Sequence, residues 1–183
     1  MIDLSLPFSL EDYRNLALAA ALGFLIGLER EWSDIRAGHE RTFAGVRTFT
    51  LVSFFGGLCA MISPGGALVG IGLAIIGALV LVAYWNEARE KPGLGATTET
   101  ALFATYLLGV AAALGALLLA AGGAVAVAVI LSAKHYTHRF AAALTEAEIR
   151  ALLRFLVVSV IVLPLLPDEG LGPYGALNPR ELW

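Results

Sequence analysis

The sequence predicts an all-α fold, a polytopic transmembrane bundle of about six short helices, and three observations support this prediction. Composition is the first: 58% of the 183 residues are hydrophobic and 15% are charged, whereas soluble domains carry about 25% charged residues. The second is that long uncharged stretches are separated by charged connections. The third is that basic residues gather at alternate connections, a pattern that is typical of multi-pass membrane proteins.

Charge and cysteine content exclude several classes of function. A net charge of -3, without a dense Lys/Arg patch, gives no basis for nucleic-acid binding. Cys59 is the single cysteine, so one chain can build neither a disulfide nor a cysteine zinc site. The sequence contains no recognisable catalytic set of a nucleophile, a general base and a residue that orients the base. It also contains no phosphate-binding glycine loop and no HExxH motif. We therefore expect that the chain is not an enzyme.

Turn signals divide the apolar stretches into helices. The first helix is expected over 15–28, with a continued turn beyond it. The stretch 48–86 is divided in two by the turn signal Ser63-Pro64-Gly65-Gly66, and the stretch 100–133 is divided at Gly122-Gly123. The last division predicts two short spans or, as the alternative, a re-entrant hairpin, because each half is short for a complete span.

The sixth helix has clear signals at both ends. Thr145 is expected to cap it, with Glu148 three residues later to complete a capping box. Pro164 and Pro167 mark where the helix loosens and stops.

Orientation follows from the positions of Lys and Arg, because the basic connections remain in the cytoplasm. With six helices, the first, third and fifth connections share one side, so both termini are expected to face away from the cytoplasm. These connections and their flanks hold all but two of the twelve basic residues: Arg30, Arg36, Arg41, Arg47, Arg89, Lys91, Lys134, Arg139, Arg150 and Arg154.

The first connection is the densest in charge. Glu29, Arg30 and Glu31 end the first helix, and Arg47 would lie about a turn inside the second helix if that helix begins near Phe43. A charged group at that depth normally has a partner, so Arg47 is expected to pair with Glu29 or Glu31. The pair is either structural, holding the two helices in register, or part of a path for an ion or substrate.

A second candidate, Thr97-Thr98-Glu99, opens the fourth helix. Threonine here suits a helix cap, and Glu99 suits the positive end of the helix dipole. Polar groups continue on the same face, because Glu99 is followed at seven residues by Tyr106, and Thr98 by Thr105. A carboxylate beside hydroxyls also suits Mg²⁺, so contact with a cation is the functional alternative to capping.

Small residues are expected where helices touch, because glycines spaced as GxxxG let backbones approach closely in lipid. Two such pairs occur, Gly23 with Gly27 and Gly66 with Gly70.

These motifs together resemble a known family. GFLIGLEREW, residues 23–32, is followed by AGVRTFTLVS, residues 44–53. The pair resembles the N-terminal membrane domain of the MgtC/SapB family, in which a GLERE-like helix end precedes a GxRT helix start. A TT-containing segment opens a later helix in that family, here at Thr97 and Thr98.

The resemblance implies a domain division and a branch. Residues 1–118 would form the MgtC/SapB-like domain, and 119–183 would begin a second hydrophobic domain. The second part is similar to bacterial proteins whose second hydrophobic half continues beyond this point. The chain is therefore expected to be truncated, or part of a larger bundle.

What the resemblance implies for function is a bacterial inner-membrane protein linked to homeostasis or transport of magnesium or another divalent cation. A polar centre would form where helices meet, with Glu29 and Glu99 as metal ligands beside Arg30, Glu31, Arg47, Thr97 and Thr98. The alternative is a non-transporting interaction module that regulates another membrane complex through glycine-lined helix faces. The expected partners are the lipid bilayer, a divalent cation and a second copy of the chain in a homodimer.

Overall fold

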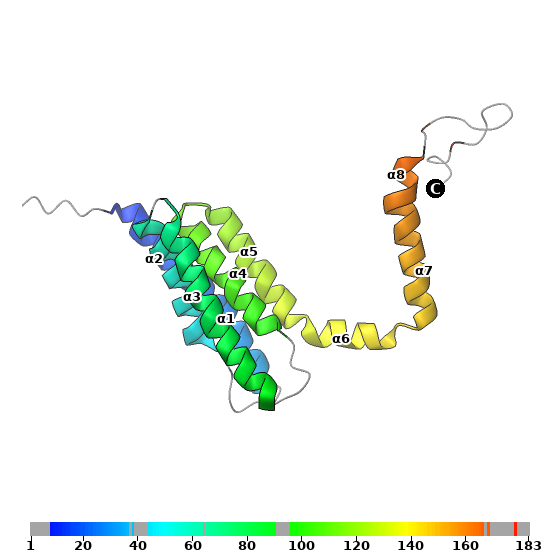
Figure 1. Cartoon of the computed structure of the whole chain (residues 1–183), viewed down its shortest axis with the longest axis horizontal. Helices are drawn as coiled ribbons and strands as arrows, with labels where there is room; N and C mark the ends of the chain where they lie inside the picture. The colour runs from blue at the N-terminus through cyan, green and yellow to red at the C-terminus, as the bar shows by residue number, and fades with distance from the viewer. Residues whose placement is uncertain are drawn as a thin grey trace, which may run out of the picture. The chain divides into compact units, whose positions relative to one another are not determined.

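The computed structural model describes residues 8–36, 38, 44–63, 65–90, 96–166, 168 and 178, and the regular structure within these residues is helical. The chain divides into two compact units, Met1–Lys134 and His135–Trp183. In the first unit, helices run up and down in an antiparallel bundle (Figure 1): α1 Leu10–Arg36, α2 Val46–Ile62, α3 Ala67–Glu90, α4 Thr97–Ala113 and α5 Leu117–Ser132. The all-α prediction is confirmed.

Helix α1 is longer at both ends than its apolar stretch. Its first turn is closed by a capping box, in which the Ser9 N–H donates to Oδ2 of Asp12 over 2.7 Å and the Asp12 N–H donates to Oγ of Ser9 over 3.2 Å. At the other end the helix continues to Arg36, whose guanidinium lies 4.4 Å from the Trp32 ring centre. The charges that were expected in a connection therefore lie mostly on regular helix.

The predicted turn between α2 and α3 is confirmed. Helix α2 ends at Ile62 and α3 begins at Ala67. Between them the Gly66 N–H donates to the Ser63 carbonyl over 2.8 Å, and Gly66 has a φ of 75°. A left-handed φ is accessible to glycine at little cost, which explains why the chain can reverse here.

The predicted division at Gly122-Gly123 is wrong, because both glycines lie inside α5. The chain turns instead at Gly115, which has a φ of 81°. The Ala116 N–H donates to the Ala111 carbonyl over 2.9 Å, closing α4 with the Schellman arrangement that favours glycine just after a helix. Gly123 serves packing, since a Cβ there would meet the Leu108 side chain of α4.

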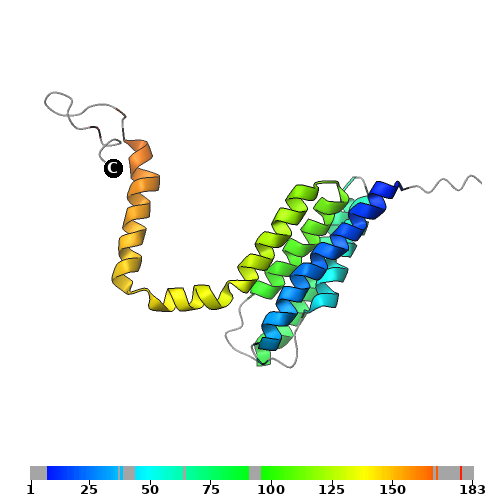
Figure 2. The ribbon, with the colours of Figure 1, turned by 180° about the vertical axis from the view of Figure 1, so that it is seen from behind.

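The core of the first unit lies among α1, α2 and α4, which all contact one another, and α5 packs on α1 and α4. Figure 2 shows α1 beside α4 and α5. Because α5 belongs to this core, the compact unit extends to Lys134. The domain boundary expected at 118/119 stays a prediction. The largest fully buried side chains include Phe49, Ile26 and Tyr106.

Glycines let the central backbones approach closely. The pair Gly23 and Gly27 lies against α2: a Cβ on Gly27 would be 2.7 Å from Cα of Val46, and a Cβ on Gly23 would meet the Phe49 carbonyl. Gly66 and Gly70 have nothing within 4 Å of such a Cβ, so this pair lies at no helix contact within the described part of the chain.

The outer surface of the bundle is apolar. Within the described residues, Ala67–Asn86 of α3 is the one segment long and apolar enough to cross a membrane by itself, with a mean hydropathy of 2.6. The apolar helices Val46–Ile62 and Leu117–Ser132 are shorter. Ile71, Ile75 and Leu79 are 49 to 63% exposed on α3. Soluble monomers rarely expose such continuous apolar surface, so this face suits a lipid environment.

The second unit consists of α6 Lys134–Ala143, α7 Glu146–Leu156, the π-helix η1 Val157–Val162 and α8 Leu163–Leu165. The predicted capping box is confirmed: the Thr145 N–H donates to Oε2 of Glu148 over 2.7 Å, and the Glu148 N–H donates to Oγ1 of Thr145 over 3.3 Å. The wider π turns begin before Pro164, where the sequence predicted loosening. Pro167 lies outside the described residues.

Candidate functional site

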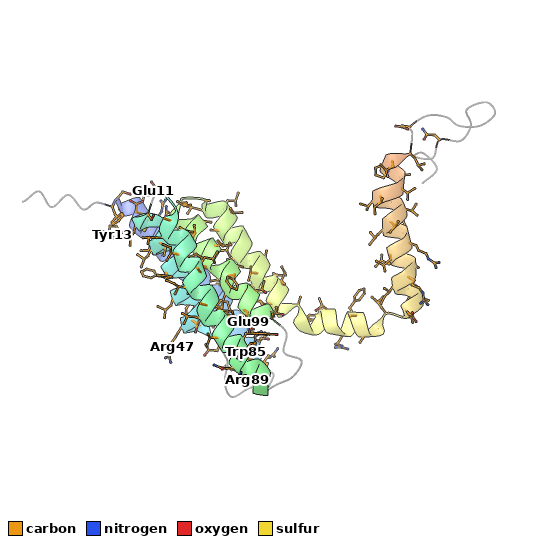
Figure 3. All side chains as sticks on the ribbon, viewed as in Figure 1. Glu11, Tyr13, Arg47, Trp85, Arg89 and Glu99 are labelled. Carbon is orange, nitrogen blue, oxygen red and sulfur yellow. The ribbon has the colours of Figure 1, made fainter. Side chains whose placement is uncertain are left out.

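Functional candidates from several helices lie toward one end of the bundle. Figure 3 shows Arg47, Arg89 and Glu99 toward that end, and Glu11 and Tyr13 toward the other. The same end holds the last turns of α1 and α3 and the first turns of α2 and α4. Of the basic residues grouped in the sequence analysis, Arg30, Arg36, Arg47 and Arg89 therefore lie toward this end of the first unit.

The charged end of α1 carries a nearly buried ion pair. Nη2 of Arg30 lies 2.8 Å from Oδ1 of Asp34, one turn later on the helix, and their side chains are 11% and 14% exposed. Arg30 continues the inner face of α1, which is buried at Gly23, Ile26 and Gly27 before it. The apolar contact face of α1 thus ends in a guanidinium that Asp34 holds in place.

Glu29 lies beside this pair and is not satisfied by it. Both of its carboxylate oxygens are buried, and neither has a hydrogen-bond partner in the described structure. Arg30 and Asp34 are the charged groups that act on Glu29. Nε of Arg30 is also buried, and it has no hydrogen-bond partner among the residues described. Because buried polar atoms normally have partners, the Glu29 oxygens and the Arg30 Nε are free to bind a ligand or water at this end of α1.

Glu31 has a structural role that the sequence did not reveal. Its Oε2 accepts a hydrogen bond from the Val46 N–H over 3.0 Å, at the first residue of α2. The N-cap residue is Gly45, which has no side chain to cap the helix, and a Cβ there would lie 2.8 Å from the same oxygen. Glu31 therefore supplies from α1 the anionic cap that α2 lacks locally.

Replacing Glu31 with alanine is expected to destabilise the bundle by about 1 kcal/mol, the usual cost of a lost helix cap. Glu31→Gln should destabilise the bundle less, because the amide oxygen can still accept a hydrogen bond from the Val46 N–H. Thermal unfolding in detergent measures the stability of both Glu31 variants. Arg47→Ala is the control, and its unfolding midpoint should stay close to that of the native chain. Equal losses for the alanine and glutamine variants would contradict the capping role.

The expected pairing of Arg47 with Glu29 or Glu31 is wrong. Helix α2 begins at Val46 and not near Phe43, so Arg47 occupies the first turn, where its side chain is exposed. Figure 3 shows it projecting from the side of the bundle. Glu31 is engaged by the Val46 N–H instead. The later helix start leaves Arg47 at the rim, where it needs no buried partner.

The start of α4 places its three candidate residues differently. The N-cap is Ala96, and no side chain caps this helix, so the expected capping by Thr97 or Thr98 is wrong. Thr97 is exposed and Thr98 is half-buried. Glu99 is 6% exposed, and its Oε2 is buried with no partner among the residues described.

Glu99 lies in a groove between α3 and α4, with a volume of about 410 Å³. Its lining is mostly apolar or aromatic, and Glu99 is its one carboxylate. The residues that line it are Gly77, Val80, Leu81, Tyr84, Ala96, Glu99, Thr100 and Phe103.

The polar line expected below Glu99 serves the fold. Thr105 and Tyr106 are fully buried. The Thr105 hydroxyl donates to the Ala101 carbonyl of its own helix over 2.7 Å, and the Tyr106 hydroxyl donates to the Val69 carbonyl of α3 over 2.9 Å. Both hydroxyls thus donate to backbone carbonyls within the bundle, which gives this line a structural role.

The single polar centre expected from the sequence is divided in the structure. Glu29 has Arg30 and Asp34 as charged neighbours, Glu31 caps α2, Arg47 is exposed, and Glu99 lies in the groove of α3 and α4. Among the described residues, no group of three or more His, Cys, Asp or Glu side chains is arranged to hold a metal ion. A cation here would need water for most of its ligands.

The comparison with family models identifies the chain. The model of the MgtC family matches residues 16–140, from the first turns of α1 into α6. Curated proteins and solved structures give no match to the chain. The family match covers more than half of the sequence, and the apolar helical bundle agrees with it. The chain is a helical membrane protein that belongs to the MgtC family.

Proposed function

We propose that this protein is a multi-pass protein of the bacterial inner membrane that contacts a hydrated divalent cation, Mg²⁺ first among them, at the charged end of α1. Membership of the MgtC family supports the link to magnesium homeostasis. The basic residues near the ends of α1, α2 and α3 support a cytoplasmic location for that end of the bundle, because basic connections are retained in the cytoplasm. The role is one of binding, without a chemical step.

The observation that carries this proposal is the state of Glu29. Its two oxygens are buried and have no partner in the described structure, whereas Glu31 is committed to α2 and Asp34 to Arg30. Leaving a carboxylate in this state is costly unless a cation or water completes its shell. Mg²⁺ keeps several of its waters and needs one or two carboxylates, so it suits a site with one free carboxylate.

The geometry favours Glu29 over Glu99 as the residue that contacts the cation. Asp34 is a charged neighbour of Glu29, and its carboxylate can accept hydrogen bonds from metal-bound water. The groove around Glu99 is lined almost entirely by apolar and aromatic residues. A hydrated divalent cation would lose favourable contacts in such surroundings.

Calorimetry with MgCl₂ on the full chain in detergent tests the proposal. The native chain should bind Mg²⁺, and Glu29→Gln should weaken binding by at least about tenfold, which corresponds to about 1.4 kcal/mol. Glu11→Gln is the matched control on the same helix, since Glu11 is exposed and pairs with Arg14 over 3.0 Å. Circular dichroism checks that each variant keeps its helices. The proposal fails if millimolar Mg²⁺ does not bind, or if Glu29→Gln binds like the native chain.

A second function, a non-transporting module that acts by binding another membrane protein or a second copy, is supported by the outer face of α3. Gly70 faces open space there, and Ile71 and Ile75 beside it are largely exposed. Small and apolar residues on one helix face suit close helix packing in lipid. Failure of Mg²⁺ to bind would leave this function as the better supported one.

A further inference from the structure

The groove between α3 and α4 is open toward the outer surface of the bundle. Leu81, which lines it, is 65% exposed. The absence of a side chain at Gly77 leaves room inside, since a Cβ there would already lie 3.3 Å from Cε1 of Phe103. The volume of about 410 Å³ lies within the range of sites that bind small organic groups.

Glu99 brings an acidic group into this apolar space. Glu99 is 6% exposed, and among the described residues its Oε2 has no hydrogen-bond partner. Within the described chain no ion pair involves Glu99. An ionised carboxylate in apolar surroundings requires a counter-charge, so the groove calls for a cationic ligand.

The lining favours an organic ammonium group over a metal ion. The Thr100 hydroxyl already donates to the Ala96 carbonyl over 2.8 Å, and the other lining residues are mostly apolar or aromatic, so the waters of a hydrated divalent cation would find few hydrogen-bond partners here. An ammonium on an alkyl chain carries donors that suit a single carboxylate. The rings of Tyr84 and Phe103, which also line the groove, can stabilise the cation through their faces, and the remaining apolar wall suits the chain.

The surface beyond the groove indicates that the ligand comes from the bilayer. Leu81, Trp85 and Arg89 follow one another at intervals of four along α3 and so share one helix face. Trp85 is 61% exposed, and the Arg89 guanidinium lies 5.3 Å from its ring centre. Such aromatic and basic pairs are typical of the membrane interface, where a guanidinium meets lipid phosphate.

We propose that this groove binds an aminophospholipid, a lipid with a phosphoethanolamine headgroup. Its ammonium lies at Glu99, its phosphate on the Arg89 side, and part of an acyl chain beside Val80 and Phe103. The site is separate from the one proposed at Glu29, so either proposal can fail without the other.

Native mass spectrometry of the full chain tests the assignment. The chain is released from detergent after equilibration with equimolar phosphatidylethanolamine and phosphatidylglycerol of the same acyl chains. The native protein should retain the ethanolamine lipid with at least about tenfold preference, the effect expected of one charge-assisted hydrogen bond. Glu99→Gln should remove the preference and leave Mg²⁺ binding in calorimetry unchanged.

Filling the groove gives an independent variant. Gly77→Leu should reduce retention of the ethanolamine lipid about tenfold, whereas Gly122→Leu, whose Cβ would meet nothing within 4 Å, should retain it as the native chain does. Equal retention of the two lipids by the native protein, retention of neither, or a preference that survives Glu99→Gln would each overturn the proposal. The comparison of lipids on the native chain needs no variant, so it stands even if a substitution prevents folding.

Discussion

A methyl group added at position 109 is expected to force α4 away from α2 and to cost the bundle about 2–3 kcal/mol, the upper part of the range for overpacking a core. A Cβ on Gly109 would fall on the Ser53 carbonyl and lie 2.9 Å from Cα of Ser53. These are backbone atoms, which cannot turn aside as a flexible side chain can. On the facing helix, a Cβ on Gly56 would meet the Tyr106 carbonyl, so the two helices touch through glycine on both sides.

Thermal unfolding of purified Gly109→Ala in detergent measures this loss, and Gly122→Ala is the matched control. Gly122 also lies inside a helix, but a Cβ there would meet nothing within 4 Å. Alanine in a helix is favoured over glycine by roughly 0.5–1 kcal/mol, so the control should be as stable as the native chain or slightly more stable. If both variants shift the midpoint equally, the contact between α2 and α4 is not the tight one described.

The sequence revealed one of the two glycine contacts, and spacing explains the difference. Gly23 and Gly27 form a GxxxG pair within one helix, and they do lie against α2. Gly109 has no glycine four residues before or after it, so no local pattern separates it from glycines that face open space. Its importance depends on Ser53, which is distant in sequence and becomes its neighbour only when α2 and α4 pack.

Local signals predicted some helix ends correctly, and interactions between helices escaped them. The capping box at Thr145 was predicted correctly because both partners lie within one turn. The cap of α2 comes from Glu31, 15 residues earlier, and no sequence pattern marks that hydrogen bond. The turn at Gly115 was missed because a single glycine gave a weaker signal than the pair Gly122-Gly123, which sits inside α5.

The charged residues near the end of α1 were correctly singled out, but their partners were not. The sequence showed that Glu29, Arg30 and Glu31 end an apolar stretch. It did not show that α1 would continue and bring Asp34 onto Arg30. The pairing depends on where the helix stops and on which of its faces is covered. Both are decided by packing in the bundle.

Removing the Arg30 guanidinium is expected to destabilise the bundle by about 3 kcal/mol, as breaking other buried ion pairs does. In Arg30→Met the apolar stem can still fill the site, but Asp34 loses its partner at 2.8 Å and Glu29 loses its nearest cation. Both carboxylates would then remain largely out of water. Arg36→Met is the control: Arg36 is exposed and contacts the Trp32 ring, so its loss should cost about 1 kcal/mol or less.

The double variant Arg30→Met/Asp34→Leu separates charge from packing. If the cost of Arg30→Met comes from an unpaired carboxylate, replacing Asp34 with leucine should recover most of the lost stability in thermal unfolding, because apolar residues can replace a buried pair without loss. If the single and double variants are equally unstable, the loss comes from guanidinium contacts other than the one with Asp34, and the ion pair contributes little. Recovery would also give a folded chain in which Glu29 has neither Arg30 nor Asp34 as a charged neighbour, so its own affinity for Mg²⁺ can be measured without their influence.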